Sequence, residues 1–275
     1  MTIRSLKDTP QSEIIDCFIN AFEGYFVPMP TDPAYYQKRW TEQEILFDLS
    51  FGCFDEQNQL IAFVLHALDY RSGAWYAYNA GTGVLAKHRG QGLIKQVYDF
   101  ALPILKKAEA KGVYLEVITE NTKAVKLYER IGFQNKRTLD CLRGTLEKEP
   151  SNPILLQRIP WARVPWERID QSTAAWGHHQ KALNGETAQF YHVLVQKKSP
   201  KKMGYFIISP DQQYLYQIGV QKDDESYWEA VVEGLAFQSQ KLRAINVDNR
   251  TKASSFLSAA GLEVYLQQYE MLWTF

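Results

Sequence analysis

The stretch GTGVLAKHRGQGL, residues 81–93, joins a strand-like run to a helix through a loop with two glycines. Residues 76–84 have the composition of a strand, and from Leu93 onward the apolar positions repeat with helical spacing. The amides of residues 89–92 therefore precede a helix, where unpaired N–H groups and the positive end of the helix dipole favour an anion. The sequence predicts a phosphate-binding loop of the strand–loop–helix type.

Two other phosphate-binding motifs fail on this stretch. A P-loop requires Lys and then Ser or Thr after its last glycine, whereas Gly92 is followed by Leu93 and Ile94. The letters GTGVLA match the dinucleotide pattern G-x-G-x-x-A, but that motif opens a helix directly and here KHRG interrupts it. The remaining interpretation is a ligand held by backbone amides, with Arg89 supplying positive charge.

The rest of the first half predicts the elements around this loop. Residues 8–22 and 30–40 combine capping residues with helical features, and three strand-like runs at 46–54, 60–70 and 75–84 indicate an antiparallel meander. A helix from Leu93 to Lys111 ended by Gly112, a buried strand at 113–118, a helix capped by Asn121 and a strand near 137–146 complete the order. This alternation is typical of an α/β fold.

A weak internal repeat predicts a second copy of this unit. TKAVKLYERIGF (122–133) aligns without gaps with TKASSFLSAAGL (251–262), and YNAGTGV (78–84) has a counterpart in YLYQIGV (214–220). The charged, proline-bearing KEPSNP (148–153) is the predicted linker. We therefore expect two domains in tandem, at 1–147 and 154–275.

Composition limits the partners. The chain of 275 residues balances 31 Lys and Arg against 31 Asp and Glu, which argues against nucleic-acid binding, and it has no stretch of the length that spans a membrane. Its three cysteines and five histidines show no metal-ligand spacing, so no metal site is expected. These features, with no apolar leader at the start, predict a cytoplasmic protein.

The combination of GTGVLAKHRGQGL with LEVITENTKAVKLYERIGF (115–133) resembles the GNAT family of acetyl-CoA-dependent N-acetyltransferases. The family motif R/Q-x-x-G-x-G/A falls on Arg89, Gly92 and Ile94, where Ile94 departs from the pattern. The resemblance implies an α/β GNAT fold with a mixed central sheet and a V-shaped splay between two strands. It also implies acetyl-CoA as co-substrate, bound by Thr82, Gly83, Val84, Arg89, Gly90, Gln91, Gly92, Leu93, Ile94, Lys95 and Asn121.

The chemistry that this resemblance implies requires a base for the attacking amine and an acid for the departing thiolate. Tyr128 suits the acid, with packing in the core as the alternative role. Glu116, a charge on an otherwise apolar strand, suits the base, and a water relay is the alternative. Tyr76, Tyr78 and Asn79 are further candidate acceptor contacts, and the aromatic-rich segment 25–40 either walls the acceptor pocket or packs in the core.

The second half lacks these groups. In the repeat alignment Leu257 replaces Tyr128, Ile245 replaces Glu116, and QKDDESYWE (221–229) replaces the glycine loop. We interpret this half as a degenerate GNAT-like domain. The sequence thus predicts an enzyme that transfers acetyl from acetyl-CoA to a primary amine of a small molecule or peptide. A non-catalytic acyl-CoA sensor is the alternative, and neither the acceptor nor the oligomeric state follows from the sequence.

Overall fold

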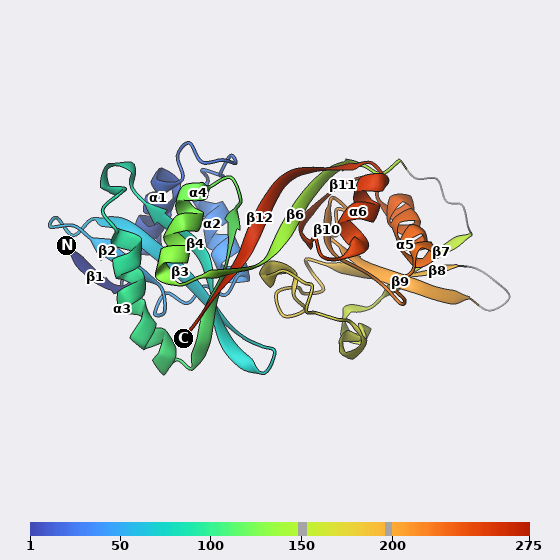
Figure 1. Cartoon of the computed structure of the whole chain (residues 1–275), viewed down its shortest axis with the longest axis horizontal. Helices are drawn as coiled ribbons and strands as arrows, with labels where there is room; N and C mark the ends of the chain where they lie inside the picture. The colour runs from blue at the N-terminus through green and yellow to red at the C-terminus, as the bar shows by residue number, and fades with distance from the viewer. Residues whose placement is uncertain (148–152, 196–199) are drawn as a thin grey trace. The chain divides into compact units, whose positions relative to one another are not determined.

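The computed structural model describes residues 1–147, 153–195 and 200–275, and the chain divides into two compact units (Figure 1). The first unit comprises Met1–Lys136 together with Glu270–Phe275, and the second comprises Arg137–Tyr269. The domains expected from the sequence, 1–147 and 154–275, do not coincide with these units, because residues 137–147 cluster with the second unit and the last six residues with the first. The expected linker at 148–153 lies outside the described residues except for Pro153.

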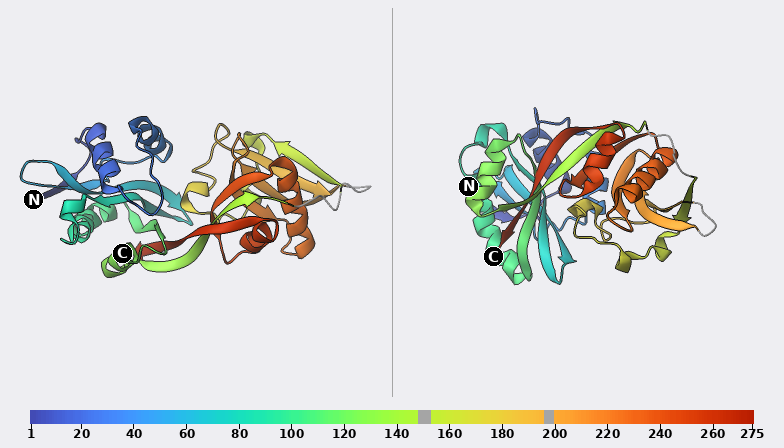
Figure 2. Two further views of the ribbon diagram at one scale, coloured as in Figure 1. Left: turned by 90° about the horizontal axis from the view of Figure 1, so that it is seen from above. Right: turned by 45° about the vertical axis from the view of Figure 1, so that its right-hand side comes forward.

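Apart from a first strand that was not predicted, the first unit has the order of helices and strands that the sequence predicts. In chain order it contains β1 (Thr2–Ser5), α1 (Gln11–Ala21), α2 (Pro33–Glu42), β2 (Phe51–Phe54), β3 (Leu60–Arg71), β4 (Ala74–Val84), the 3-10 turn η1 (Ala86–His88), α3 (Leu93–Lys107), β5 (Ala110–Ile118), α4 (Thr122–Ile131) and the start of β6 (Gln134–Thr145). Strands β1 to β4 pair antiparallel in sequence order, and β5 pairs parallel to β4. Helices α1 and α2 cover one face of this sheet and α3 and α4 the other (Figure 2, left).

The aromatic side chains of α1 explain the packing on the first face. Phe18 stacks on Phe63 of β3 with ring centroids 5.5 Å apart and also contacts Tyr36 and Trp40 of α2. On the other face, Tyr98 of α3 is fully buried. Apolar side chains therefore alternate between two cores along β3, as a strand covered on both faces requires.

The C-terminal residues of β12 (Leu262–Thr274) complete this first unit. Trp273 packs against Tyr98 and Phe133 with centroid distances of 5.9 and 5.8 Å, and the Phe275 amide donates to the Lys111 carbonyl at 3.2 Å. A Cβ atom on Gly132 would lie 2.8 Å from the Trp273 indole nitrogen. The last strand is thus part of the core of the unit that begins the chain.

One predicted helix boundary is wrong. Helix α3 ends at Lys107 and not at Lys111, so Gly112 is not its stop signal. Gly112 lies inside β5, where an added Cβ would be 2.5 Å from the Trp273 carbonyl oxygen. The glycine lets β12 approach β5 closely. This contact could not be predicted locally, because β12 lies at the other end of the sequence.

The second unit repeats the order strand, loop, helix, strand, helix, strand. Its elements are most of β6, β7 (Ile154–Ile159), the 3-10 turns η2 (Trp161–Arg163), η3 (Trp166–Arg168) and η4 (Trp176–His178), β8 (Gln189–Val195), β9 (Lys201–Ile208), β10 (Tyr214–Val220), α5 (Glu225–Gln238), β11 (Lys241–Asp248), α6 (Lys252–Ala259) and most of β12. The strand order is β12-β6-β11-β10-β9-β8-β7. Helices α5 and α6 pack in one core, and the segment of 3-10 turns builds a separate one with β8 and β9.

Candidate active site

The strands β4 and β5 of the first unit pair only along part of their length. Their parallel register runs from Trp75 and Ala110 to Asn79 and Leu115, whereas β4 continues to Val84 and β5 to Ile118. At the same point β4 gains one residue against β3, because Asn79 and Gly81 face consecutive residues of the partner strand. This bulge bends β4 as it leaves its parallel partner, which produces the predicted V-shaped splay.

The side chain of Asn79 holds this bulge. Its Nδ2 donates to the Thr82 Oγ1 at 2.7 Å and to the Tyr98 hydroxyl oxygen at 2.8 Å, and its Oδ1 accepts from the Gly81 amide at 3.1 Å. Asn79 is buried, so each of these bonds satisfies a polar atom that water does not reach. The sequence suggested Asn79 as an acceptor contact, whereas its bonds make it the anchor of the strand bend.

The backbone groups of Thr82 and Val84 face the open side of β4. The Leu85 amide donates to Ile61 of β3 at 2.9 Å, and successive residues of a strand direct their N–H and C=O groups to opposite edges. Gly83 therefore directs its groups toward β3, and Thr82 and Val84 direct theirs into the splay. The amides of both residues and the Thr82 carbonyl can pair with an extended amide ligand, whereas the Val84 carbonyl already accepts from the Arg89 Nε.

The glycines of β4 have a packing role. A Cβ on Gly81 would lie 2.9 Å from the Phe18 ring, and one on Gly83 would lie 2.5 Å from the Phe63 ring and 2.8 Å from the Ala21 Cβ. These contacts let α1 pack closely on β4. Gly83, one of the three strand residues expected at the ligand, is thus a glycine because α1 and β3 leave no room for a side chain there.

The loop glycines behave differently. Gly90 and Gly92 have φ of 79° and 71°, and an added Cβ would meet no atom within 4 Å at either position. Gly92 is the N-cap of α3 and supplies no side-chain cap, so the first-turn amides, including that of Lys95, point out of the helix end. The side chains of Leu93 and Ile94 are buried. Ile94, which departs from the family motif, therefore does not project from this loop.

Arg89 fixes the loop to its surroundings. Its Nε donates to the Val84 carbonyl at 3.2 Å and its Nη2 to the carbonyl of Ala21, the last residue of α1, at 2.9 Å. The side chain is exposed at the same time. Arg89 thus combines a structural bridge with the positive charge that the sequence predicted, while the Lys95 side chain is paired with Asp99 at 2.7 Å.

Tyr128 of α4 lies beside the bend of β4. It is buried, and its ring packs edge-on against Phe133 with centroids 5.5 Å apart. Burial raises the pKa of Tyr128, and hydrogen bonding with Thr82 and Asn79 opposes that rise. The phenol therefore keeps its proton at neutral pH. Both of its predicted roles, packing and proton donation, have a physical basis here.

Asn121 begins α4, as predicted. Its Oδ1 accepts from the Ala124 amide at 3.2 Å, which is the N-cap hydrogen bond. A hydrogen bond with Asn121 also lowers the pKa of Tyr25, against the larger effect of burial, which raises it. Tyr25 belongs to the aromatic-rich segment expected at the acceptor pocket, and this contact brings that segment to the start of α4.

Glu116 is bound by a tyrosine of the neighbouring strand. The Tyr78 hydroxyl donates to the Glu116 Oε2 at 3.0 Å. Burial raises the pKa of Tyr78 well above its ordinary value, and the adjacent Glu116 charge raises it further. Tyr78 therefore stays protonated and orients the carboxylate. The sequence suggested Glu116 as the base and Tyr78 as an acceptor contact, but not the bond between them.

A buried ion pair near Glu116 was not anticipated from the sequence. Arg71 of β3 pairs with Asp69 at 2.9 Å, and both side chains are largely buried. Desolvation lowers the pKa of Arg71, while the charges of Asp69 and Glu116 raise it. The pair follows strand alternation, since residues 69 and 71 share a face, but nothing in the sequence marks that face as part of a site.

The second unit keeps the strand geometry of this site and loses its polar groups. β10 and β11 pair in parallel only at Tyr214 and Leu215, and a bulge follows directly in β10. In both units the parallel pairing ends and the bulge begins at equivalent positions, which supports the alignment of 214–220 with 78–84. Leu257, the counterpart of Tyr128, is fully buried.

The helix that follows β10 begins with a carboxylate. Asp224 caps α5, because its Oδ1 accepts from the Ser226 amide at 3.1 Å. The neighbouring Asp223 accepts from the Trp228 indole at 2.8 Å and pairs with Lys252 at 3.4 Å. Carboxylates thus take the place of the glycine amides of the first unit.

Comparisons with known proteins agree with this geometry. The sequence model described as "Acetyltransferase (GNAT) family" matches residues 14–133. Most of the first unit is therefore similar to the domains of this acetyltransferase family. N-alpha-acetyltransferase 30 of Schizosaccharomyces pombe is 26% identical over 99 residues, which are 36% of this chain and 62% of that protein, so the match spans less than two thirds of the relative.

Solved structures extend the fold to the whole chain. The glucosamine N-acetyltransferase region of a fungal multi-domain β-N-acetylglucosaminidase has a TM-score of 0.72 at 14% identity, covering 98% of this chain and 38% of the larger one. A tandem GNAT protein from the clavulanic acid biosynthesis pathway has a TM-score of 0.66 at 11% identity, covering 99% and 98%. The chain therefore has the α/β GNAT fold with a mixed, open sheet, as predicted.

Three further findings concern the described residues. They hold no cluster of three or more His, Cys, Asp or Glu side chains arranged for a metal ion. No helix among them has the length and apolar character needed to cross a membrane. Cys17, Cys53 and Cys141 are buried, and none of them forms a disulfide within the described residues.

Proposed function

We propose that the first unit transfers an acetyl group from acetyl-CoA to a primary amine, by direct attack in a ternary complex. One observation carries this proposal: the splay beyond Asn79 leads to a loop whose Gly90 and Gly92 leave the amides at the start of α3 open. An extended chain with amide groups suits the Thr82 and Val84 backbone, and a pyrophosphate suits the uncapped helix end. Pantetheine diphosphate combines these two features.

Each residue expected to hold acetyl-CoA is given a role according to the backbone or side-chain groups that it offers. Thr82 and Val84 offer backbone groups to the pantetheine arm, and the amides from Gly90 to Lys95 offer donors to the pyrophosphate. Arg89 adds charge and keeps the loop against β4. Asn121 and Gly83 act indirectly, the first by capping α4 and contacting Tyr25, the second by letting α1 approach.

The proposed chemistry uses two groups of this unit. Glu116 accepts a proton from the attacking amine, directly or through a water molecule, as a C–N bond forms and the C–S bond of the thioester breaks. Tyr128 donates to the departing sulfur, and its raised pKa keeps it protonated for this step. Tyr78 orients Glu116 through its 3.0 Å hydrogen bond.

The acceptor is proposed at the level of a primary amine. The name of the curated relative makes a peptide α-amino group one class to test. The other class is small molecules, among them polyamines, amino acids and aminoglycosides. We place the protein in the cytoplasm on the basis of its cysteine usage.

The test is the release of free thiol from acetyl-CoA by the full chain, with each amine class offered in turn. The proposal expects acceptor-dependent thiol release that Glu116→Gln reduces strongly, with acetyl-CoA affinity retained. Binding of acetyl-CoA without acceptor-dependent release for any class would instead support the sensor interpretation.

A further inference from the structure

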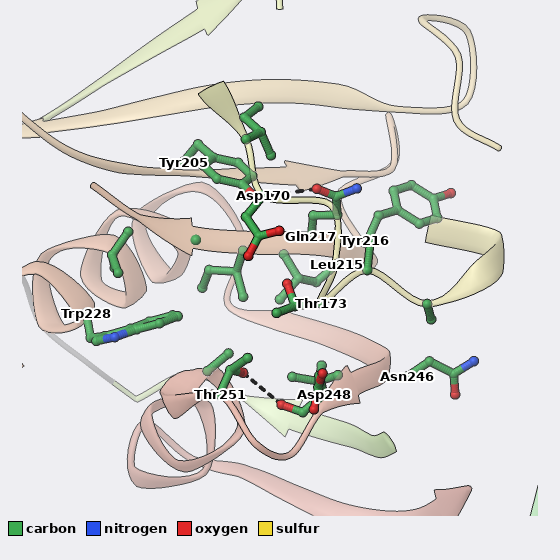
Figure 3. Close-up of a pocket in the computed structure, with 18 of the residues that line it drawn as sticks. Asp170, Thr173, Tyr205, Leu215, Tyr216, Gln217, Trp228, Asn246, Asp248 and Thr251 are labelled. Carbon is green, nitrogen blue, oxygen red and sulfur yellow. Dashed lines mark hydrogen bonds between the residues drawn. The ribbon is translucent and has the colours of Figure 1, made fainter. Parts of the chain in front are cut away.

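The second unit contains a cavity of about 290 Å³ beyond the point where β10 and β11 cease to pair (Figure 3). β10 forms one wall, Asn246, Val247 and Asp248 of β11 another, and a segment before η4, residues 168–175, lies across it. Small-molecule pockets measure ~300–1,000 Å³. The cavity therefore suits a small organic compound and not a whole coenzyme.

A buried arginine holds the covering segment in place. Arg137 donates to the carbonyls of Ser172 and Ala174, each at 3.0 Å, and pairs with Asp248 at 2.8 Å. Arg250 also binds Asp248, at 2.7 Å. The Asp248 charge is thus neutralised by two guanidinium groups, and it contributes little net charge to the cavity that it lines.

The loop after β10 disfavours an anionic ligand. Asp224 caps the Ser226 amide at the start of α5, where a phosphate would otherwise bind, and Asp223 lies next to it. A phosphate or carboxylate here would meet negative charge in place of open amides. The chemistry of this cleft therefore differs from that of its counterpart in the first unit.

One carboxylate points into the cavity. Figure 3 shows the Asp170 side chain directed toward the centre, between the Tyr205 ring and the Trp228 indole. Within the described part of the chain Asp170 forms no ion pair, and its Oδ1 accepts from the Ser172 amide at 2.8 Å. Arg168, the other charged residue at this end, is adjacent to Glu167 at 3.5 Å. The exposed Asp170 carboxylate thus has no cationic partner among the described residues.

Aromatic rings and open backbone groups complete the lining. The face of an aromatic ring attracts a cation, and Tyr205 and Trp228 flank the carboxylate. Because the Gln221 amide donates to Met203 of β9 at 2.8 Å, strand alternation directs the backbone groups of Ile218 and Val220 into the cavity. These groups offer hydrogen bonds to polar atoms of a ligand.

We propose that this cavity is a binding site for a small organic cation, an ammonium or guanidinium compound, with its charge at Asp170 between Tyr205 and Trp228. Its body lies along β10, against the backbone of Ile218 and Val220. This site is independent of acetyl transfer in the first unit and requires no acetyl-CoA.

The test uses the full chain and four probes of matched length: butylguanidinium, butylammonium, neutral valeramide and anionic valerate. Calorimetry and ligand-observed NMR report affinity and stoichiometry. We expect the cations to bind with one equivalent and at least tenfold more tightly than valeramide or valerate. Asp170→Asn, which keeps an acceptor for the Ser172 amide, lowers the cation affinity at least tenfold. Glu186→Gln, an exposed charge loss in the same β7–β8 connection, leaves it unchanged.

Two results would overturn the proposal. One is equal affinity for butylammonium and valeramide, and the other is full cation affinity in a folded Asp170→Asn protein. Glu116→Gln separates this site from the first unit, because cation binding that depends on Asp170 must survive that change. Its loss in Glu116→Gln would assign the cation to the acceptor position and contradict the inference.

Discussion

β4 and β10 bend at equivalent residues, yet the helices that follow them begin in opposite ways. In both strands a bulge directly follows the last parallel pair, at Asn79 in the first unit and at Leu215 in the second. α3 then starts at Gly92 with open amides, and α5 starts at Asp224 with a carboxylate cap. The two units thus share the bend of the strand and differ at the helix start, and we expect the few residues at the helix start to decide which ligand binds.

The largest expected effect contrasts the two residues at the Tyr128 position. Leu257→Ala removes a fully buried side chain from the second core and should lower the free energy of unfolding by about 3 kcal/mol. Urea titration with hydrogen exchange at α6 measures this loss. Affinity for acetyl-CoA should stay the same at a temperature where the variant is folded, and a large drop would show that the second unit supports the first site.

Tyr128→Phe tests the other member of that pair. It keeps the ring and removes the proton donor, so turnover should fall ~100-fold with little change in acetyl-CoA affinity or melting temperature. Because the pKa of Tyr128 is raised, the wild-type rate should not fall on the alkaline side through about pH 9. Loss of affinity with turnover retained at saturation would make Tyr128 a packing residue.

These two substitutions also mark the limit of sequence reasoning. Residues 81–93 and the repeat predicted the loop and the loss of Tyr128 in the second copy, because each depends on local pattern, whereas the splay was expected only from the resemblance to the GNAT family. The anchor role of Asn79 depends on Tyr98, and Arg89 reaches the carbonyl of Ala21, 68 residues away. Such bonds follow from tertiary packing, so the local sequence contains no sign of them.

The roles of the glycines could not be predicted from the sequence either. Four glycines between residues 81 and 92 suggested one ligand-binding backbone, but Gly81 and Gly83 admit the rings of α1 and β3, and only Gly90 and Gly92 have positive φ and open surroundings. A strand glycine and a loop glycine look the same in a sequence. The two can be told apart only when the structure shows which atoms an added Cβ would contact.

Charge at the loop provides a smaller test. Arg89→Glu places a carboxylate at the start of α3 and removes the bridge to Val84 and Ala21, so acetyl-CoA affinity should fall at least tenfold, about 1.4 kcal/mol. Calorimetry measures the change. Lys87→Glu is the matched control, since it reverses an exposed charge on η1 without these bonds. An equal effect of both variants would indicate general electrostatics in place of a site.

The smallest expected effect concerns the α5 cap. Asp224→Ala should lower the free energy of unfolding by about 1 kcal/mol, and Asp32→Ala at the cap of α2 should cost a similar amount. The wild-type chain should bind one equivalent of acetyl-CoA, in the first unit. Because Asp223 remains, Asp224→Ala should keep that stoichiometry, and a second equivalent would show that the cap alone closes the second cleft.

The return of the C-terminal strand to the first unit has a consequence during synthesis. Glu270–Phe275 leave the ribosome after the entire second unit, yet Trp273 fills the core between Tyr98 and Phe133. Translation adds ~5–20 residues per second. A nascent chain that has produced residue 136 must therefore wait roughly 7–27 seconds, until Trp273 is made, with an unfilled core and an unpaired edge at β5. The half that carries the proposed chemistry is thus begun first and finished last.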